Sequence, residues 1–258
     1  MTLRLAAVEY GEGPPLAILH GLFGAARNWA EVAQRLAAHH RVIALDLRNH
    51  GASPWADAMD YGAMADDVRA TLEALGHRRF GLIGHSMGGK AAMVLALLHA
   101  EAVARLVVVD IAPLAHPPHH LGYVEAMRAL DLAGIERRGT ADARLAPAVP
   151  DAAERAFLLQ NLVLAEGGAR WRLNLAAIAQ AMPSLAGFSI FPAGSRYPGP
   201  ALFVAGGRSD YLRPEHEPAV RRLFPKARIA RIAAAGHWLH VEQPQAFLDL
   251  VEPFLAAP

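Results

Sequence analysis

The sequence predicts an α/β protein with a mostly parallel central sheet and helices on both faces. Short apolar stretches alternate with longer ones whose apolar residues recur at helical spacing, which is typical of strand–helix repeats. The alternation stops after Asp110, continues as helical patterns broken by proline and glycine, and resumes near Ala201. We therefore expect a single α/β domain, with a core of residues 1–111 and 199–258 and a helical cap of residues 112–198.

Seven short segments have the apolar content and the length of strands. Leu106–Asp110 is β-branched and short, as expected of a strand buried on both faces of a parallel sheet. The expected strands are Leu3–Glu9, Leu16–His20, Val42–Leu47, Arg79–Ile83, Leu106–Asp110, Ala201–Ala205 and Ala227–Ile232.

The expected helices are longer and begin or end at recognisable residues. The first begins at Asn28, with Glu31 three residues later completing a capping-box pattern, and Gly76 ends the second. We expect no strand in the cap. The other helices are expected at Asp60–Leu75, Met87–His99, Tyr123–Leu132, Asp151–Glu166, Asn174–Met182, Glu215–Phe224 and Gln245–Leu255.

Composition excludes several functional classes. With 53% apolar and 19% charged residues, the chain can bury a sizeable core. Its 25 basic and 24 acidic side chains give a net charge of +1, whereas a nucleic-acid binder needs a basic face. The absence of cysteine excludes disulfides, cysteine nucleophiles, iron–sulfur clusters and thiolate zinc sites.

No segment has the pattern of a targeting sequence or a membrane span. The first residues meet the acid Glu9 before an apolar region of normal length develops. The longest apolar stretch, Ala91–Leu98, is far shorter than the ~20 residues that cross a bilayer. We therefore expect a soluble cytoplasmic protein, either a monomer or a dimer.

The loop after the fourth expected strand carries the pattern Gly-x-Ser-x-Gly, as Gly84-His85-Ser86-Met87-Gly88. A strand before it and a helix after it are the context that this motif requires. The turn forces Ser86 into a strained backbone conformation, and side chains at positions 84 and 88 would collide. The Ser86 hydroxyl would project above the sheet as a nucleophile, with the Met87 amide directed at a substrate carbonyl oxygen.

A phosphate-binding loop is the competing interpretation of the same segment. Gly84 to Ala91 matches Gly-x4-Gly-Lys-Ser/Thr except at its last position. The loop needs a hydroxyl there to hold Mg²⁺, and Ala91 has none. We therefore favour the serine nucleophile.

A serine hydroxyl becomes a good nucleophile only when a base accepts its proton. The motif occurs in chains ordered nucleophile, acid, histidine, so the base should lie near the C-terminus. His237 follows the last expected strand in the segment Gly236-His237-Trp238, and we expect it to be that base. His240, nearby, is expected to pack or hydrogen-bond.

Two loops offer the acid that would orient this histidine. Asp110 ends the strand that follows the helix expected after Ser86. Asp210 lies after the next expected strand. In most proteins with this serine turn, the acid stands at about the position of Ser209 in this sequence. Asp210 lies one residue beyond that position. We favour Asp110 and leave Asp210 open.

A second backbone amide should act together with the Met87 amide to bind the oxyanion, the negative charge that forms on the substrate carbonyl oxygen. The loop His20-Gly21-Leu22-Phe23-Gly24 follows an early strand, from which such a donor comes. Gly21 permits close approach of the chain, and the Leu22 amide is the expected donor, with Phe23 as the alternative.

Four separated motifs together resemble the α/β-hydrolases and, within that fold, the bacterial YbfF-type esterases. The resemblance runs from about Leu16 to Leu255 and is weaker through the cap. Two runs, Arg48-Asn49-His50-Gly51 and Val109-Asp110-Ile111-Ala112-Pro113, make it specific beyond the general fold. The four motifs are His20–Gly24, Asp46–Pro54, Gly84–Lys90 and Gly236–Trp238.

This resemblance implies roles for particular residues and a substrate class. The family's acid maps to Asp110, and a serine in its hydrogen-bond network maps to Ser209. This sequence departs by placing Asp210 beside that serine, which keeps the assignment of the acid open. The family hydrolyses short-chain esters and acyl thioesters.

Other conspicuous residues have simpler interpretations. Arg48 and His50 are expected to fix their loop to its neighbours. The run from His116 to His120 suggests a metal, but its prolines spoil the ligand spacing and no carboxylate accompanies it, so we expect an exposed cap loop. We expect no metal and no cofactor. The residues expected to line the pocket are Phe23, His85 and Trp238.

The sequence as a whole predicts a serine hydrolase that cleaves carboxylic esters or acyl thioesters with an apolar acyl group. Two alternatives remain open: a carbon–carbon bond hydrolase or lyase with the same triad, and a non-catalytic small-molecule receptor. Dehalogenases and epoxide hydrolases are disfavoured, because they need an aspartate at the position of Ser86.

Overall fold

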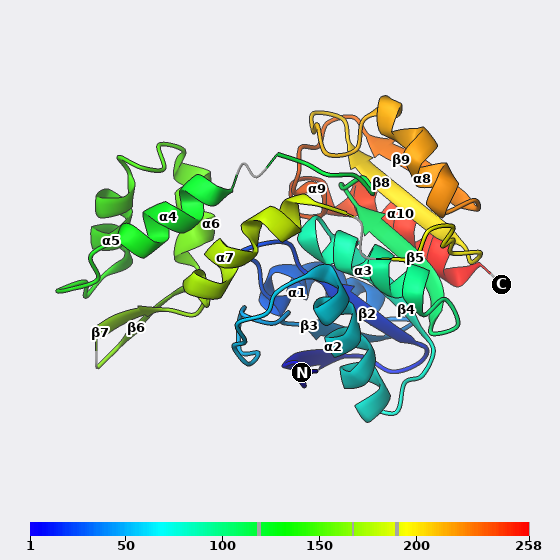
Figure 1. Cartoon of the computed structure of the whole chain (residues 1–258), viewed down its shortest axis with the longest axis horizontal. Helices are drawn as coiled ribbons and strands as arrows, with labels where there is room; N and C mark the ends of the chain where they lie inside the picture. The colour runs from blue at the N-terminus through cyan, green and yellow to red at the C-terminus, as the bar shows by residue number, and fades with distance from the viewer. Residues whose placement is uncertain (118–119, 167, 189–190, 258) are drawn as a thin grey trace.

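The computed structural model describes residues 1–117, 120–166, 168–188 and 191–257, and within them a seven-stranded sheet forms the centre (Figure 1). The strand order is β1-β3-β2-β4-β5-β8-β9. β1 is antiparallel to β3, and all other neighbours are parallel. The strands are β1 Ala7–Tyr10, β2 Pro15–Leu19, β3 Arg41–Leu45, β4 Phe80–His85, β5 Val103–Val109, β8 Ala201–Gly206 and β9 Ala227–Ile232. The predicted fold class is confirmed.

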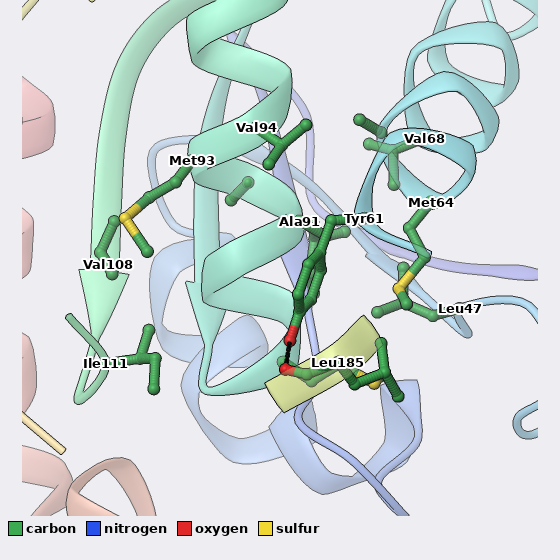
Figure 2. Packing of buried hydrophobic residues seen from close by; sticks show 14 of the residues in the cluster. Leu47, Tyr61, Met64, Val68, Ala91, Met93, Val94, Val108, Ile111 and Leu185 are labelled. Atoms are coloured by element: carbon green, nitrogen blue, oxygen red, sulfur yellow. Dashed lines mark hydrogen bonds between the residues drawn. The ribbon is translucent and has the colours of Figure 1, made fainter. Parts of the chain in front are cut away.

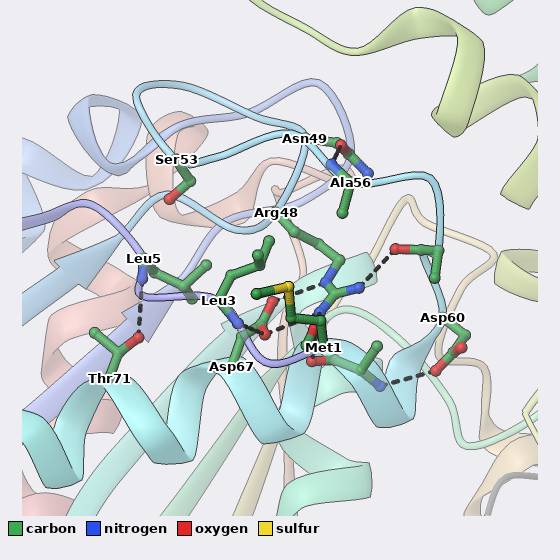
Figure 3. Close-up of polar contacts among 12 residues, drawn as sticks. Met1, Leu3, Leu5, Arg48, Asn49, Ser53, Ala56, Asp60, Asp67 and Thr71 are labelled. Atoms are coloured by element: carbon green, nitrogen blue, oxygen red, sulfur yellow. Dashed lines mark hydrogen bonds and ion pairs between the residues drawn. The ribbon is translucent and has the colours of Figure 1, made fainter.

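The largest difference among the predicted strands is at the N-terminus, where β1 begins at Ala7 instead of Leu3. The amides of Leu3 and Leu5 donate to side chains of helix α2 (Tyr61–Ala74), at 2.7 Å to Asp67 and 2.9 Å to Thr71, respectively (Figure 3). These tertiary bonds satisfy the amides that strand pairing would otherwise use.

Helices cover both faces of the sheet. Helices α1 (Ala30–Leu36) and α10 (Pro244–Ala256) pack on one face, and α2 (Tyr61–Ala74), α3 (Met87–Leu98) and α8 (Glu217–Leu223) lie on the other. In Figure 2, side chains of α2 face those of α3, which in turn lies against β5. Short turns η2 (Pro214–His216) and α9 (Leu239–Glu242) complete the core.

The helical segment predicted to begin at Asn28 begins two residues earlier, as a 3₁₀ turn, and its α-helical part begins two residues later; the capping box at Asn28 is wrong. A 3₁₀ turn, η1 (Ala26–Trp29), precedes α1. The Asn28 side chain accepts from the Ala25 amide at 2.8 Å, and the carboxylate of Asp46 accepts from the Ala26 amide at 2.7 Å. The neighbouring loop therefore supplies an acceptor at the start of this turn, which no local pattern shows.

The elements between β5 and β8 form a lobe beside the sheet (Figure 1). The expectation of an all-helical cap is wrong, because β6 and β7 form an antiparallel hairpin. The helix expected at Asp151–Glu166 ends at Leu159, and the chain turns at Asn161, whose carbonyl accepts from the Arg172 amide at 2.8 Å. These elements are α4 Leu121–Ala129, α5 Arg138–Leu145, α6 Ala152–Leu159, β6 Leu162–Ala165, β7 Gly168–Trp171 and α7 Leu175–Ala186.

The division into a core of residues 1–111 and 199–258 and a cap of residues 112–198 stays a prediction from the sequence. Throughout the ranges given above, no helix is long and apolar enough to cross a membrane.

Candidate active site

The loop between β4 and α3 has the sharp geometry that its glycines predicted. Ser86 has φ 53° and ψ −116°, a conformation that L-residues rarely adopt. A Cβ on Gly84 would lie 2.3 Å from the Gly88 carbonyl oxygen, and one on Gly88 would lie 2.4 Å from the His20 carbonyl oxygen. Both contacts are too short for any side chain, so glycine is required on each side of the serine.

A carboxylate and an imidazole meet at the carboxyl edge of the sheet. Nδ1–H of His237 donates to Oδ2 of Asp110 at 2.8 Å. Asp110 is fully buried, and its other oxygen accepts from the Gly206 amide at 2.9 Å. The Ser209 hydroxyl also donates to Oδ2. With Nδ1 protonated toward the carboxylate, Nε2 of a neutral His237 is free to accept a proton.

Asp210 lies away from this pair. Its side chain is 87% exposed, and the nearest cation is the Arg213 guanidinium at 3.7 Å. The geometry therefore favours Asp110 as the partner of His237, and it gives Ser209 the network position that the resemblance implied.

The histidine is fixed from two further sides. The ring of Tyr211 stacks on the His237 ring, with centroids 4.1 Å apart and an interplanar angle of 29°. Nε2–H of His85 donates to the His237 carbonyl oxygen at 2.9 Å. Burial and the neighbouring His237 lower the pKa of His85 well below its usual value, so this donor stays neutral.

Ser86 and His237 open onto the same cavity, which has a volume of about 620 Å³. Over the residues that the structure describes, the Ser86 hydroxyl makes no hydrogen bond to His237. Such bonds often tighten only when substrate is bound. The predicted lining residues Phe23, His85 and Trp238 all contribute to the wall.

The two residues predicted to donate to the oxyanion, Leu22 and Met87, line a cavity together with Ser86. Met87 is the first residue of α3, so its amide has no acceptor within the helix. The Phe23 amide, the alternative to Leu22, donates to Nε2 of His50 at 3.2 Å. Because Phe23 is thus occupied, the geometry favours Leu22.

Buried residues after β3 hold the loop His20–Gly24, which carries the proposed oxyanion donor Leu22, in place. Nδ1–H of His50 donates to the Arg48 carbonyl oxygen at 2.9 Å, which leaves Nε2 as the acceptor for Phe23. Burial lowers the pKa of His50 to about 3, so the ring is neutral near pH 7. The Arg48 guanidinium pairs with Asp67 at 2.7 Å and donates to the Ala58 carbonyl at 2.6 Å (Figure 3). Arg48 and His50 therefore fix their loop, as predicted.

Other histidines and the lysine of the motif have structural partners. His240 is buried and stacks on Trp29 at 4.0 Å, and burial lowers its pKa to about 3. The ring nitrogens of His116 lie 3.0 and 3.2 Å from backbone carbonyls. The Lys90 ammonium donates to cap carbonyls instead of facing an open phosphate site.

The predicted exposed loop from His116 to His120 is described only in part, because residues 118–119 lie outside the described ranges. Neither His116 nor Pro117 is fully buried. Among residues with described positions, no group of three or more histidine, aspartate or glutamate side chains could hold a metal ion.

Sequence reasoning missed several residues of the site because no local motif marks them. Tyr211 stacks on the histidine, and Asn161 of the cap donates from Nδ2 to the Phe23 carbonyl at 2.8 Å. The ring centroids of Phe157, on α6, and Trp238 lie 5.5 Å apart, and both residues line the cavity at Ser86. Only the tertiary fold brings these cap residues to the sheet edge.

The chain as a whole is similar to known proteins. A family model described as "alpha/beta hydrolase fold" matches residues 14–244. The chain is 42% identical over 252 residues to mouse "sn-1-specific diacylglycerol lipase ABHD11", covering 94% of this chain and 81% of that protein. It is 36% identical over 242 residues to "Esterase YbfF" of Escherichia coli strain K12, covering 93% and 92%. A solved structure named "Marine microorganism esterase" aligns with a TM-score of 0.93 and 35% identity, covering 98% of this chain and all of that chain.

Proposed function

The chain belongs to the α/β-hydrolase fold family, and from that premise we propose that it is a serine hydrolase of carboxylic esters or acyl thioesters, acting through an acyl-enzyme on Ser86. The relatives named as esterases and lipases support an ester-hydrolysing enzyme. The observation that carries the catalytic assignment is the Asp110–His237 hydrogen bond at the edge of a cavity that Ser86 also lines.

The proposed reaction begins with proton transfer from Ser86 to Nε2 of His237 as the serine oxygen bonds to the substrate carbonyl carbon. Asp110 holds the ring in the required tautomer and stabilises its charged form. The same proton then passes to the leaving oxygen or sulfur as its bond to carbon breaks. Water, deprotonated by His237, next attacks the acyl carbon. The bond from that carbon to Ser86 breaks, His237 returns the proton to the serine oxygen, and the acid is released.

Charge develops on the carbonyl oxygen during both steps. The Leu22 and Met87 amides are the proposed donors to this oxyanion, and each such donor is commonly worth ~10²–10³ in rate. Met87 also begins α3, and a helix N-terminus carries partial positive charge.

Replacing the nucleophile tests this proposal. Ser86→Ala should lower kcat for p-nitrophenyl acetate to near background and abolish labelling by a fluorophosphonate probe. Ser184→Ala, at an exposed serine of α7, is the matched control and should keep both. A Ser86→Ala variant with activity near wild type would contradict the serine mechanism.

Two other functions remain distinguishable by experiment. A carbon–carbon bond hydrolase or lyase would label with the probe but hydrolyse no ester in a broad screen. A small-molecule receptor would bind ligand in the cavity and neither label nor turn over. Monomeric or dimeric state and cytoplasmic location stay predictions from the sequence.

A further inference from the structure

A second, smaller cavity of about 60 Å³ also opens onto Ser86. It shares Leu22, Ser86, His120 and Tyr211 with the large cavity, and residues at the C-terminal end of α7 also line it. Both predicted oxyanion residues, Leu22 and Met87, contribute to its wall. The side chains that enclose the rest include Tyr61, Lys90, Ile111, Met182 and Leu185.

The position of His237 distinguishes the two cavities chemically. His237 and Trp238 line the large cavity, whereas the described lining of the small one includes neither. In ester cleavage the histidine must deliver its proton to the leaving oxygen or sulfur. The leaving group therefore has to lie on the side where His237 is exposed, and the acyl chain extends to the other side of Ser86.

We propose that the small cavity is the acyl subsite and the large cavity the leaving-group subsite, with Met182 and the end of α7 limiting the length of the acyl chain. This inference rests on the proposed function and assigns the two halves of its substrate. It makes the selectivity of the enzyme asymmetric: a short, neutral acyl group is combined with a bulky alcohol or thiol.

Two polar side chains in the wall of the small cavity, Lys90 and Tyr61, are already bonded within the protein. The Lys90 ammonium lies 3.4, 3.2 and 2.9 Å from the carbonyl oxygens of Leu185, Ala186 and Gly187. The Tyr61 hydroxyl donates to the Leu185 carbonyl at 2.6 Å, as Figure 2 shows. With these groups occupied, the wall offers mainly apolar contacts, which suit an alkyl chain.

The same bonds fix the end of the cavity. Lys90 and Tyr61 belong to the core helices α3 and α2, and both hold the C-terminal end of α7. Lys90 is only 2% exposed, so this anchor is shielded from water. A volume of about 60 Å³ compares with ~30 Å³ per water molecule in the liquid, which leaves room for an acyl group of roughly two to four carbons.

Two substrate series test the assignment in the wild-type protein. In p-nitrophenyl esters from acetate to decanoate, kcat/KM should fall about 100-fold between butyrate and octanoate, because longer chains overfill the cavity. In acetate esters with alcohols of rising size, kcat/KM should fall less than about tenfold, because the large cavity accepts them.

Variants in the two walls should separate these preferences. Met182→Ala enlarges the small cavity and should raise the octanoate-to-butyrate ratio at least about tenfold, whereas Ala186→Leu should lower the butyrate-to-acetate ratio. Phe157→Ala, in the wall of the large cavity only, is the matched control. It should change the dependence on the alcohol and leave the acyl profile as in wild type.

The outcomes distinguish this inference from the proposed function. Ester hydrolysis that depends on Ser86 but is fastest with octanoate or decanoate would overturn the subsite assignment and leave the hydrolase intact. A shift of the acyl profile by Phe157→Ala, with none by Met182→Ala or Ala186→Leu, would reverse the two subsites. Failure to hydrolyse any ester would instead contradict the proposed function.

Discussion

The two walls of the candidate site are built differently. On the sheet side, backbone hydrogen bonds to neighbouring strands hold the strained residues: the Ser86 amide donates to Val109 at 3.0 Å and the Asp110 amide to Val204 at 2.8 Å. Both residues have positive φ, 53° and 49°. On the cap side, Phe157 and Met182 project from α6 and α7. The cap is joined to the core mostly by bonds that involve a side chain, together with backbone bonds such as the one from the Asn174 amide to the Asn49 carbonyl at 3.1 Å. Strained positions need an overdetermined support, which the sheet supplies and the cap does not.

The difference suggests a division of labour. The residues proposed to make and break bonds lie on the sheet side, where the backbone is fixed. The residues proposed to determine substrate selectivity lie on the cap side. The walls meet at Phe23, which is bonded to His50 of the core and to Asn161 of the cap. Changes on the sheet side should therefore have large effects on the chemical step, and those on the cap side smaller ones.

The two aspartates at the sheet edge give the sharpest test. Asp110→Asn should lower kcat by about 10⁴-fold, because an amide can no longer hold His237 in the required tautomer. Asp210→Asn, at an exposed carboxylate, should change kcat by less than about twofold. The measurement is kcat for p-nitrophenyl acetate in folded protein. The reverse ranking would move the acid to the second loop.

Acid should destabilise the sheet side through its buried neutral histidines. Burial lowers the pKa of His50 and of His240 to about 3, below their ordinary 6.5. Between these values the unfolded chain binds protons that the folded chain does not, so stability is greatest above pH 6.5 and falls as pH decreases toward 3. At pH 5 each histidine should cost on the order of 2 kcal/mol relative to pH 7.

Urea unfolding at pH 7 and pH 5 measures this effect. His240→Gln removes one of these titrating groups and should reduce the difference in the free energy of unfolding between the two pH values. If the variant loses as much stability between pH 7 and pH 5 as wild type, His240 does not contribute to the pH dependence of the free energy of unfolding.

The contact between the walls should have the smallest effect. Asn161→Ala removes the bond to the Phe23 carbonyl and should lower kcat by up to about tenfold with little change in KM, because the neighbouring Leu22 amide is the proposed donor to the oxyanion. Gln160→Ala is the matched cap control, since its side chain bonds to Asn28 instead. It should stay within about twofold of wild type. Equal effects of both variants would assign the loss to the cap as a whole.

Much of the core was predictable because its signals are local. Apolar stretches marked the strands, and Gly84 and Gly88 predicted the sharp turn at Ser86, since only backbone geometry and short contacts are involved. The cap was less predictable. The helix expected to reach Glu166 ends at Leu159, because Asn161 makes contacts with residues distant in sequence.

The sequence by itself determined the order of strands and helices, the sharp turn Gly84–Gly88 that carries Ser86 and the loop that carries His237. Each of these depends on residues adjacent in the chain. The tertiary structure decided which carboxylate meets the histidine, since Asp110 and Asp210 both follow strands that end at the same edge. It also favours Leu22 over Phe23 as the proposed oxyanion donor, because the Phe23 amide is bonded to His50. These choices depend on the direction of a side chain or an amide, which is set by packing between distant segments and leaves no local pattern in the sequence.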